Sequence, residues 1–204
     1  MKLLYHPLSS NSRRVLAVAC QLSIRIEREL VDLAAGVQRS PEFLRVNPNG
    51  KVPVLIDGEL SLTESHAIAL YLAEGSPLYP AERHVRADVH RWMFWSAQHF
   101  SAAIGAITRE RISKHMVGGV GGPDPAVVAH GEKLVRDAAQ ILDDHVATRR
   151  WLVGDQPSVA DLSLAAPLMH TERARLPIES FAHVRAWFDR VQALAGWREA
   201  ASLA

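Results

Sequence analysis

Residues 47–68 constrain the fold of this chain more than any other stretch. They contain a turn, a strand that begins at Pro53, a second short strand, and a helix start at Glu64 and Ser65. A proline cannot donate to a β-ladder, so it belongs at an edge or a bend. The Val52–Pro53 peptide bond is rigid, and because it precedes a proline it can adopt the cis form. A cis bond would turn the N–H and C=O of Val52 outward, where an extended peptide can pair with them.

Glu64 and Ser65 lie where a helix begins, and free N–H groups at that position favour a carboxylate guest. The stretch therefore offers backbone pairing beside Pro53 and a pocket for one charged end of a ligand. These two features together predict a site for an extended, peptide-like molecule.

The first eighty residues predict a small α/β unit. Residues 24–33 alternate apolar and polar side chains, as in a half-buried strand, and Asp57-Gly58 is a strong hairpin signal. The order β-α-β-α-β-β-α predicts a mixed four-stranded sheet, built first by a crossover and then by a hairpin. The expected strands cover 2–6, 24–33, 53–57 and 59–62, and the expected helices cover 13–22, 40–46 and 64–74.

The rest of the chain has helical spacing. We expect a first domain at 1–75, a proline-bearing linker at 76–82 and an all-helical domain at 83–204. Ser158 and Asp161 form a capping box before an apolar helix, which makes Asp161 structural. The expected helices cover 83–114, 125–147, a segment starting at 158, and 181–194 as the last.

Composition excludes several classes of protein. Lys and Arg number 23 against 22 Asp and Glu, so no nucleic-acid or membrane-attracting patch is expected. No apolar run reaches the ~18–20 residues of a membrane span, and Pro7 interrupts the N-terminus too early for a signal peptide. Cys20 is the single cysteine, which excludes an internal disulfide and fits a reducing cytosol. His90, His99 and His115 are spaced too widely along one helix to share a metal ion, so no metal site is expected.

Four motifs in order resemble those of cytosolic glutathione S-transferases. The resemblance covers essentially the whole chain and implies a thioredoxin-like N-terminal domain followed by an all-α domain. It implies glutathione as a substrate with no further cofactor, a homodimer, a cytoplasmic location and a role in detoxification. The motifs are Ser9–Val15, Lys51–Leu55, Glu64–Ile68 and Ser158–Asp161.

Binding residues follow from this resemblance by position. The backbone of Val52, ahead of a cis Pro53, would pair with the cysteinyl residue of glutathione. The Glu64-Ser65 pair would hold the γ-glutamyl amino and carboxylate groups. Gln38 and Lys51 fall where side chains reach the glycine carboxylate, although Gln38 replaces a histidine found in some plant-type members.

The loop at residues 9–12 is the expected catalytic element. A glutathione thiol with a pKa of about 8.5 is only roughly 3% thiolate at pH 7. A helix N-terminus and a hydroxyl or amide hydrogen bond to the sulfur both lower that pKa. The loop enters a helix and carries such donors.

Three residues of this loop are candidates for the sulfur contact. Ser9 resembles the catalytic serine of the theta and phi classes and ranks first. Asn11 ranks second, because nu-like bacterial members have an asparagine at this position. Zeta-class members have a cysteine there, and its replacement by Asn11 in this chain argues against the isomerase chemistry of that class. Ser10 ranks third, since it takes the place of a cysteine if the loop aligns with beta-class members. Tyr5 lies inside the first strand and is not expected to act.

The expected reaction is attack of the glutathione thiolate on an apolar electrophile held against the helical domain. Aromatic residues such as Trp92, Trp95 and Phe100 could line that pocket or pack in a core or dimer interface. Arg109 and Arg111 are expected to be solvated. Two other functions remain open: glutathione-dependent disulfide reduction, suggested by Asn11, and a non-catalytic ligand carrier of the same fold.

Overall fold

A computed structural model of the chain describes residues 1–114 and 118–203. Its sheet has four strands in the order β2-β1-β3-β4, with β1 parallel to β2 and antiparallel to β3, and β3 antiparallel to β4. This is the mixed sheet that the sequence predicts. The strands are β1 (Lys2–Tyr5), β2 (Glu27–Leu30), β3 (Val54–Asp57) and β4 (Leu60–Leu62).

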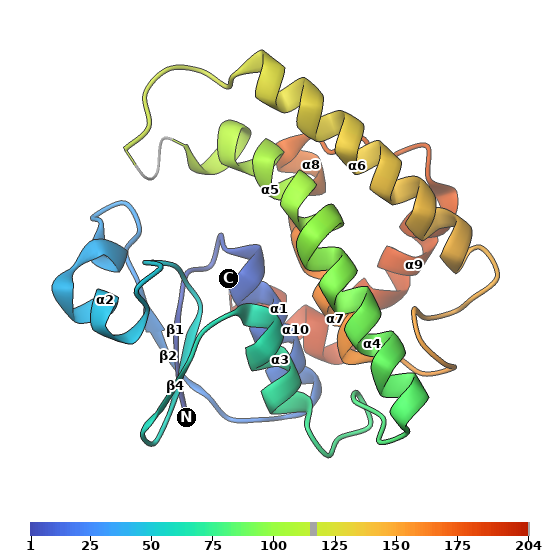
Figure 1. The fold of residues 1–204 in the computed structure, drawn as a ribbon, viewed down its shortest axis with the longest axis horizontal. Coiled ribbons are helices and arrows are strands. Elements are labelled where there is room, and N and C mark those ends of the chain that lie inside the picture. The colour runs from blue at the N-terminus through green and yellow to red at the C-terminus, as the bar shows by residue number, and fades with distance from the viewer. Residues whose placement is uncertain (115–117, 204) are drawn as a thin grey trace.

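Helices cover both faces of this sheet (Figure 1). Neighbouring residues of a strand point to opposite faces. Leu4 accordingly packs in a small cluster with Phe43 of α2 (Pro41–Val46), while Leu3 packs in the main core with α1 (Ser10–Gln21) and α3 (Ser65–Ala73). The main core continues into the helical half, so one apolar cluster joins both halves of the chain.

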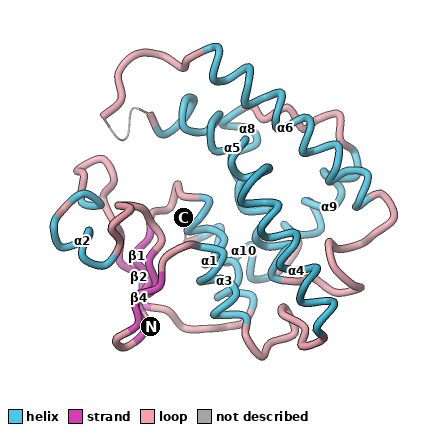
Figure 2. The backbone as a smooth tube through the Cα atoms, in the orientation of Figure 1, coloured by secondary structure: helices cyan, strands magenta, loops and turns pink. Residues whose placement is uncertain are grey.

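After α3 the described chain contains helices and loops without strands (Figure 2). Asp161 is fully buried and accepts hydrogen bonds of 2.8–2.9 Å from Leu152 N, Ser158 N, Ser158 Oγ and Trp187 Nε1. The capping box and its structural role are therefore confirmed. The helices are α4 (Arg83–Trp95), α5 (Ser101–Thr108), α6 (Pro125–Val146), α7 (Val159–Ala165), α8 (Thr171–Ala174), α9 (Ala182–Gln192) and α10 (Ala195–Ser202).

Four local details differ from the expectations. The strand expected at 24–33 is only β2, and all four of its residues are exposed because it forms a sheet edge. The helix expected from Arg13 begins at Ser10. The long helix expected over 83–114 contains two π-helical turns, and the helix expected to be last is followed by α10.

Candidate active site

A cleft of about 660 Å³ lies between the loop that opens α1 and the helical half. It draws its walls from the loop before α1, the segment before α2, the turn before β3, and the end of α5. Of the nine predicted site residues, six line the cleft: Ser9, Ser10, Asn11, Gln38, Lys51 and Val52. The other three, Pro53, Glu64 and Ser65, do not line it.

The N-terminus of α1 opens on this cleft. Ser9 is the N-cap, and its hydroxyl oxygen accepts a hydrogen bond from Ser12 N at 3.2 Å. A hydroxyl that accepts one bond can still donate its own proton. The N–H groups of Ser10 and Asn11 find no acceptor among the described residues, as expected for the first turn of a helix. The loop therefore presents a hydroxyl and free amides, which together suit an anion.

Arg14 joins this loop to α3. It is 1% exposed, and its Nη1 donates both to Asn11 Oδ1 at 2.6 Å and to Ser65 Oγ at 2.5 Å. Its Nε donates to the carbonyl of Ser163 at 3.2 Å. Burial lowers the pKa of Arg14 to about 9, which leaves the guanidinium charged at neutral pH. Arg14 was not predicted as a site residue from the sequence, although it stands one position before the apolar face of the first helix.

The contact with Arg14 also orients Asn11. An arginine only donates hydrogen bonds, so the atom of Asn11 that faces it is the carbonyl oxygen. The amide nitrogen of Asn11 then faces away from Arg14. Asn11 is exposed and lines the cleft, and its free amide can serve as a donor there.

Glu64 has the backbone geometry of a constrained residue. It precedes α3 with φ 63° and ψ 103°, a left-handed conformation that costs energy in a residue with a side chain. Its exposed carboxylate makes no hydrogen bond or ion pair within the described chain. Ser65 follows as the first residue of α3 and is buried against Arg14. Ser65 is linked to the cleft residue Asn11 through Arg14.

The turn before β3 supplies the other end of the cleft. The Val52–Pro53 bond is cis, and Asn47 Nδ2 holds the carbonyl of Lys51 at 2.7 Å. Gly50 has φ 59°, and a Cβ there would lie 2.8 Å from the guanidinium of Arg39. Arg39 therefore packs over this turn, and it lines the cleft beside Lys51. Arg39 was not predicted as a site residue from the sequence.

Gln38 is positioned as an acceptor. Its Nε2 donates to the carbonyl of Leu33 at 3.2 Å, and its buried Oε1 has no hydrogen-bond partner. An amide oxygen suits an N–H group and repels a carboxylate. In this geometry the cations Lys51 and Arg39 are better placed than Gln38 for a carboxylate.

Among the described residues, the helical half lines the cleft without any Trp, Phe or Tyr side chain. Phe100 is fully buried and Trp92 is 2% exposed, both in the main core, and Trp95 does not line the cleft. Arg109 is exposed on the cleft, but Arg111 donates to Glu132 Oε1 at 2.6 Å and is not solvated as expected. Gly105, Thr108, Arg109, Ile112, Ser113 and His170 provide this wall.

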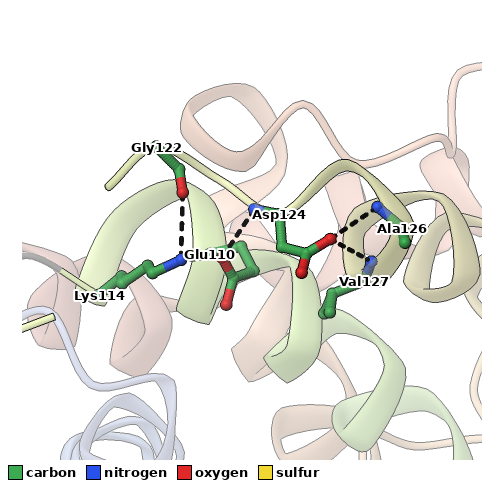
Figure 3. A network of polar contacts seen from close by, with 6 residues as sticks. All are labelled: Glu110, Lys114, Gly122, Asp124, Ala126 and Val127. Carbon is green, nitrogen blue, oxygen red and sulfur yellow. Dashed lines mark hydrogen bonds and ion pairs between the residues drawn. The ribbon is translucent and has the colours of Figure 1, made fainter. Parts of the chain in front are cut away.

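A polar network fixes the end of this wall (Figure 3). Glu110 is 9% exposed and accepts hydrogen bonds from Lys114 Nζ at 2.8 Å and from Asp124 N at 2.9 Å. These donors lower the pKa of Glu110. Lys114 also donates to the carbonyl of Gly122 at 3.1 Å, while Asp124 caps α6. The network ties the π-helical turn Arg109–Ser113 to the start of α6.

Neither a membrane span nor a metal site is found among the described residues. No helix among them is long and apolar enough to cross a bilayer. No three His, Cys, Asp or Glu side chains among them gather as metal ligands; His115, one of the histidines considered above, lies outside the described residues.

Comparisons with known proteins agree along the chain. Residues 1–74 match the family model "Glutathione S-transferase, N-terminal domain", and residues 125–190 match "Glutathione S-transferase, C-terminal domain". Glutathione S-transferase F10 of Arabidopsis thaliana is 30% identical over 96% of this chain and 94% of its own length. Glutathione S-transferase 3 of Zea mays is 33% identical over 95% of this chain and 89% of its own length.

Solved structures are similar over nearly the full length. Glutathione transferase F7 of Populus trichocarpa superposes with a TM-score of 0.87 at 27% identity, covering 98% of this chain and 97% of its own. A glutathione S-transferase-I bound with lactoylglutathione has a TM-score of 0.85 at 27% identity, covering 100% and 99%. By sequence and by fold, this chain belongs to the glutathione S-transferase family.

Proposed function

We propose that this chain is a glutathione transferase whose cleft holds glutathione between α1 and the turn before β3. All the relatives above are named transferases, and they favour neither of the two other functions, disulfide reduction and ligand carriage. The similar transferase bound with lactoylglutathione holds a glutathione that carries a substituent. A cleft of about 660 Å³ gives room for glutathione and a small second molecule.

The proposed contacts follow the charges of glutathione. The backbone of Val52 beside the cis Pro53 pairs with the cysteinyl residue, and Lys51 and Arg39 hold the glycine carboxylate. Gln38 accepts a hydrogen bond from an N–H of the peptide. Glu64 takes the γ-glutamyl ammonium, and Ser65 with the N-terminus of α3 takes the γ-glutamyl carboxylate.

Ser9 is the proposed donor to the sulfur. The thiol loses its proton to water, and the hydroxyl of Ser9 and the free N–H groups of α1 stabilise the thiolate. Asn11 adds its amide, and Ser10 contributes its backbone N–H. The thiolate then attacks the electrophilic carbon, a C–S bond forms, and the leaving group departs with its electron pair. The observation that carries this proposal is Ser9 as N-cap on the same cleft as Val52.

Replacing Ser9 by alanine tests the proposal, and Ser40→Ala is its matched control. Ser40 caps α2 through the same bond, Phe43 N to Ser40 Oγ at 3.2 Å, but does not line the cleft. Both variants should lose cap stability of about 1 kcal/mol. Only Ser9→Ala should lower kcat/KM for 1-chloro-2,4-dinitrobenzene at least tenfold, or about 1.4 kcal/mol. In Ser9→Ala, a pH titration of the ultraviolet absorbance of the bound thiolate should show that the pKa of the glutathione thiol is higher than in the wild type.

Other outcomes of this experiment would reassign the roles. Conjugation that is equally reduced in both variants would make Ser9 a cap only, and parallel Asn11→Ala and Ser10→Ala variants would then identify the donor. Reduction of a small disulfide that far exceeds conjugation, and that disappears in Asn11→Ala, would overturn the transferase proposal in favour of a reductase. A homodimer and a cytosolic location remain predictions that rest on the family.

A further inference from the structure

Three cations follow one another at and just after the end of α5, and they differ in their partners. Arg111 is paired with Glu132 and with the carbonyl of Ala174. Lys114 is paired with Glu110. The side chain of Arg109 makes no hydrogen bond or ion pair within the described chain, and Arg109 lines the cleft. Its guanidinium is therefore available to a ligand.

The surroundings of Arg109 favour an anion as that ligand. No Asp or Glu lines the cleft in the part of the chain that the structure describes. The hydroxyl of Thr108 is already donated to the carbonyl of Gly105 at 3.1 Å. Ser113 makes no such bond among the described residues, so its hydroxyl can donate beside Arg109. An arginine and a hydroxyl donor together match the geometry of a carboxylate.

Glutathione does not require this cation. In the proposed binding mode Lys51 and Arg39, both from the first half of the chain, hold its glycine carboxylate. Its other carboxylate lies at the N-terminus of α3. Arg109 comes from the opposite wall, where a second substrate would lie.

The wall is also built to hold its position. Arg109 and Ser113 are the ends of a π-helical turn, a helix form that occurs frequently at functional sites. Glu110, inside that turn, is fixed by Lys114 and by the start of α6 (Figure 3). A fixed backbone gives the Arg109 side chain a defined origin, which favours specific binding.

We propose that the second substrate is an electrophile that carries a carboxylate, and that Arg109 and Ser113 bind this carboxylate. The inference rests on the proposed transferase function and narrows its substrate class, which the sequence had indicated as apolar. For a chloroarene, the thiolate adds to the carbon that bears chlorine, the C–S bond forms, and chloride leaves with the electron pair. The carboxylate of the substrate takes no part in bond making and only orients the ring.

A matched substrate pair tests this inference. The probes are 4-chloro-3,5-dinitrobenzoate and the uncharged 4-chloro-3,5-dinitrobenzamide, and the variants are Arg109→Gln, Arg109→Lys and Arg83→Gln. Arg83 is an exposed arginine away from the cleft, so its variant controls for the lost charge. We expect Arg109→Gln to lower kcat/KM for the benzoate at least tenfold. The kcat/KM for the benzamide and the KM for glutathione should stay within twofold of the wild-type values. Arg109→Lys keeps the charge but loses the planar fork, so it should recover part of the loss. Arg83→Gln should leave kcat/KM for both substrates unchanged.

Binding without chemistry separates this inference from the transferase proposal. Calorimetry would measure 3,5-dinitrobenzoate, which has no leaving group, in the presence of S-methylglutathione. Loss of dinitrobenzoate binding in Arg109→Gln supports the anion site. If the wild type conjugates neither of the two chloroarenes, that result overturns only the transferase proposal and leaves the anion site supported. Equal losses for benzoate and benzamide, or a raised KM for glutathione alone, would overturn the role of Arg109.

Discussion

Arg14 shows how one buried side chain can organise a site that it does not line. It holds Asn11 on one side and Ser65 on the other, and these residues lie 54 positions apart in the sequence. In the proposed binding mode they serve the sulfur and the γ-glutamyl end of glutathione. The two ends of the ligand are thus coupled through one guanidinium. Arg14 is a positioning residue, because it acts through these two partners.

Replacing Arg14 by methionine should therefore weaken glutathione binding. We expect the KM for glutathione to rise about tenfold, equivalent to about 1.4 kcal/mol, because Asn11 and Ser65 lose their common donor. Arg14→Lys should also weaken glutathione binding, since an ammonium lacks the planar fork that reaches several acceptors at once. Steady-state kinetics at varied glutathione would measure the change.

Arg13→Met is the matched control for this prediction. Arg13 is the neighbouring buried arginine, 7% exposed; its side chain lies over the ring of Trp197 and makes no hydrogen bond to a predicted site residue within the described chain. Urea unfolding would show the stability loss in each variant. If both variants lose stability and neither changes the KM for glutathione, Arg14 is structural only.

At the scale of elements, the sequence predicted the turns and caps, which depend on residues close together in the chain. The hairpin after β3 and the capping box at Ser158 were both found where their residue types indicated. The helix α10 was missed, because its position depends on a contact 175 residues away. Gly196 N donates to Gln21 Oε1 at 3.0 Å, and a Cβ on Gly196 would lie 2.2 Å from the backbone nitrogen of Gln21.

Gly196→Ala should accordingly force α10 away from α1. Overpacking against backbone cannot be relieved by a side-chain rotation, so we expect a loss of unfolding free energy of at least about 2 kcal/mol. Gly105→Ala is the matched control, because Gly105 lies inside α5 with open space around its Cα. That substitution should stabilise the helix by about 0.5–1 kcal/mol. Equal urea midpoints for the two variants would contradict the close α1–α10 contact.

At the scale of the whole molecule, the sequence predicted half of the cleft. The wall from the first half carries motifs that can be recognised by spacing, namely Ser9 to Asn11 and Lys51 to Val52. The opposite wall depends on how long helices pack, which one-dimensional periodicity does not show. Trp92 and Phe100 have the spacing of a pocket lining and of a core alike, and the structure places both in the core. Arg109 faces the cleft instead.

The same packing predicts how the molecule unfolds. One apolar cluster contains residues from both halves, and α1 contacts α10 and α7, so we expect the halves to unfold as one cooperative unit. The chain provides separate reporters, because all five tryptophans lie at or after Trp92 while Cys20 lies on α1. Burial raises the pKa of the Cys20 thiol to about 11. Unfolding should lower the pKa of Cys20 by about two units, and the thiolate fraction near pH 8 should therefore increase roughly a hundredfold.

Pulse labelling with iodoacetamide across a urea series would therefore follow the first half, while tryptophan fluorescence follows the helical half. The two midpoints should coincide in the wild type, and Cys20→Ala should abolish labelling while keeping the fluorescence transition. Labelling of Cys20 at lower urea than the fluorescence change would mean that the thioredoxin-like half opens alone. Such opening would disrupt one wall of the cleft while the helical wall stays folded. A single shared transition instead means that any change which loosens the α1–α10 contact also weakens the site, because both depend on one core.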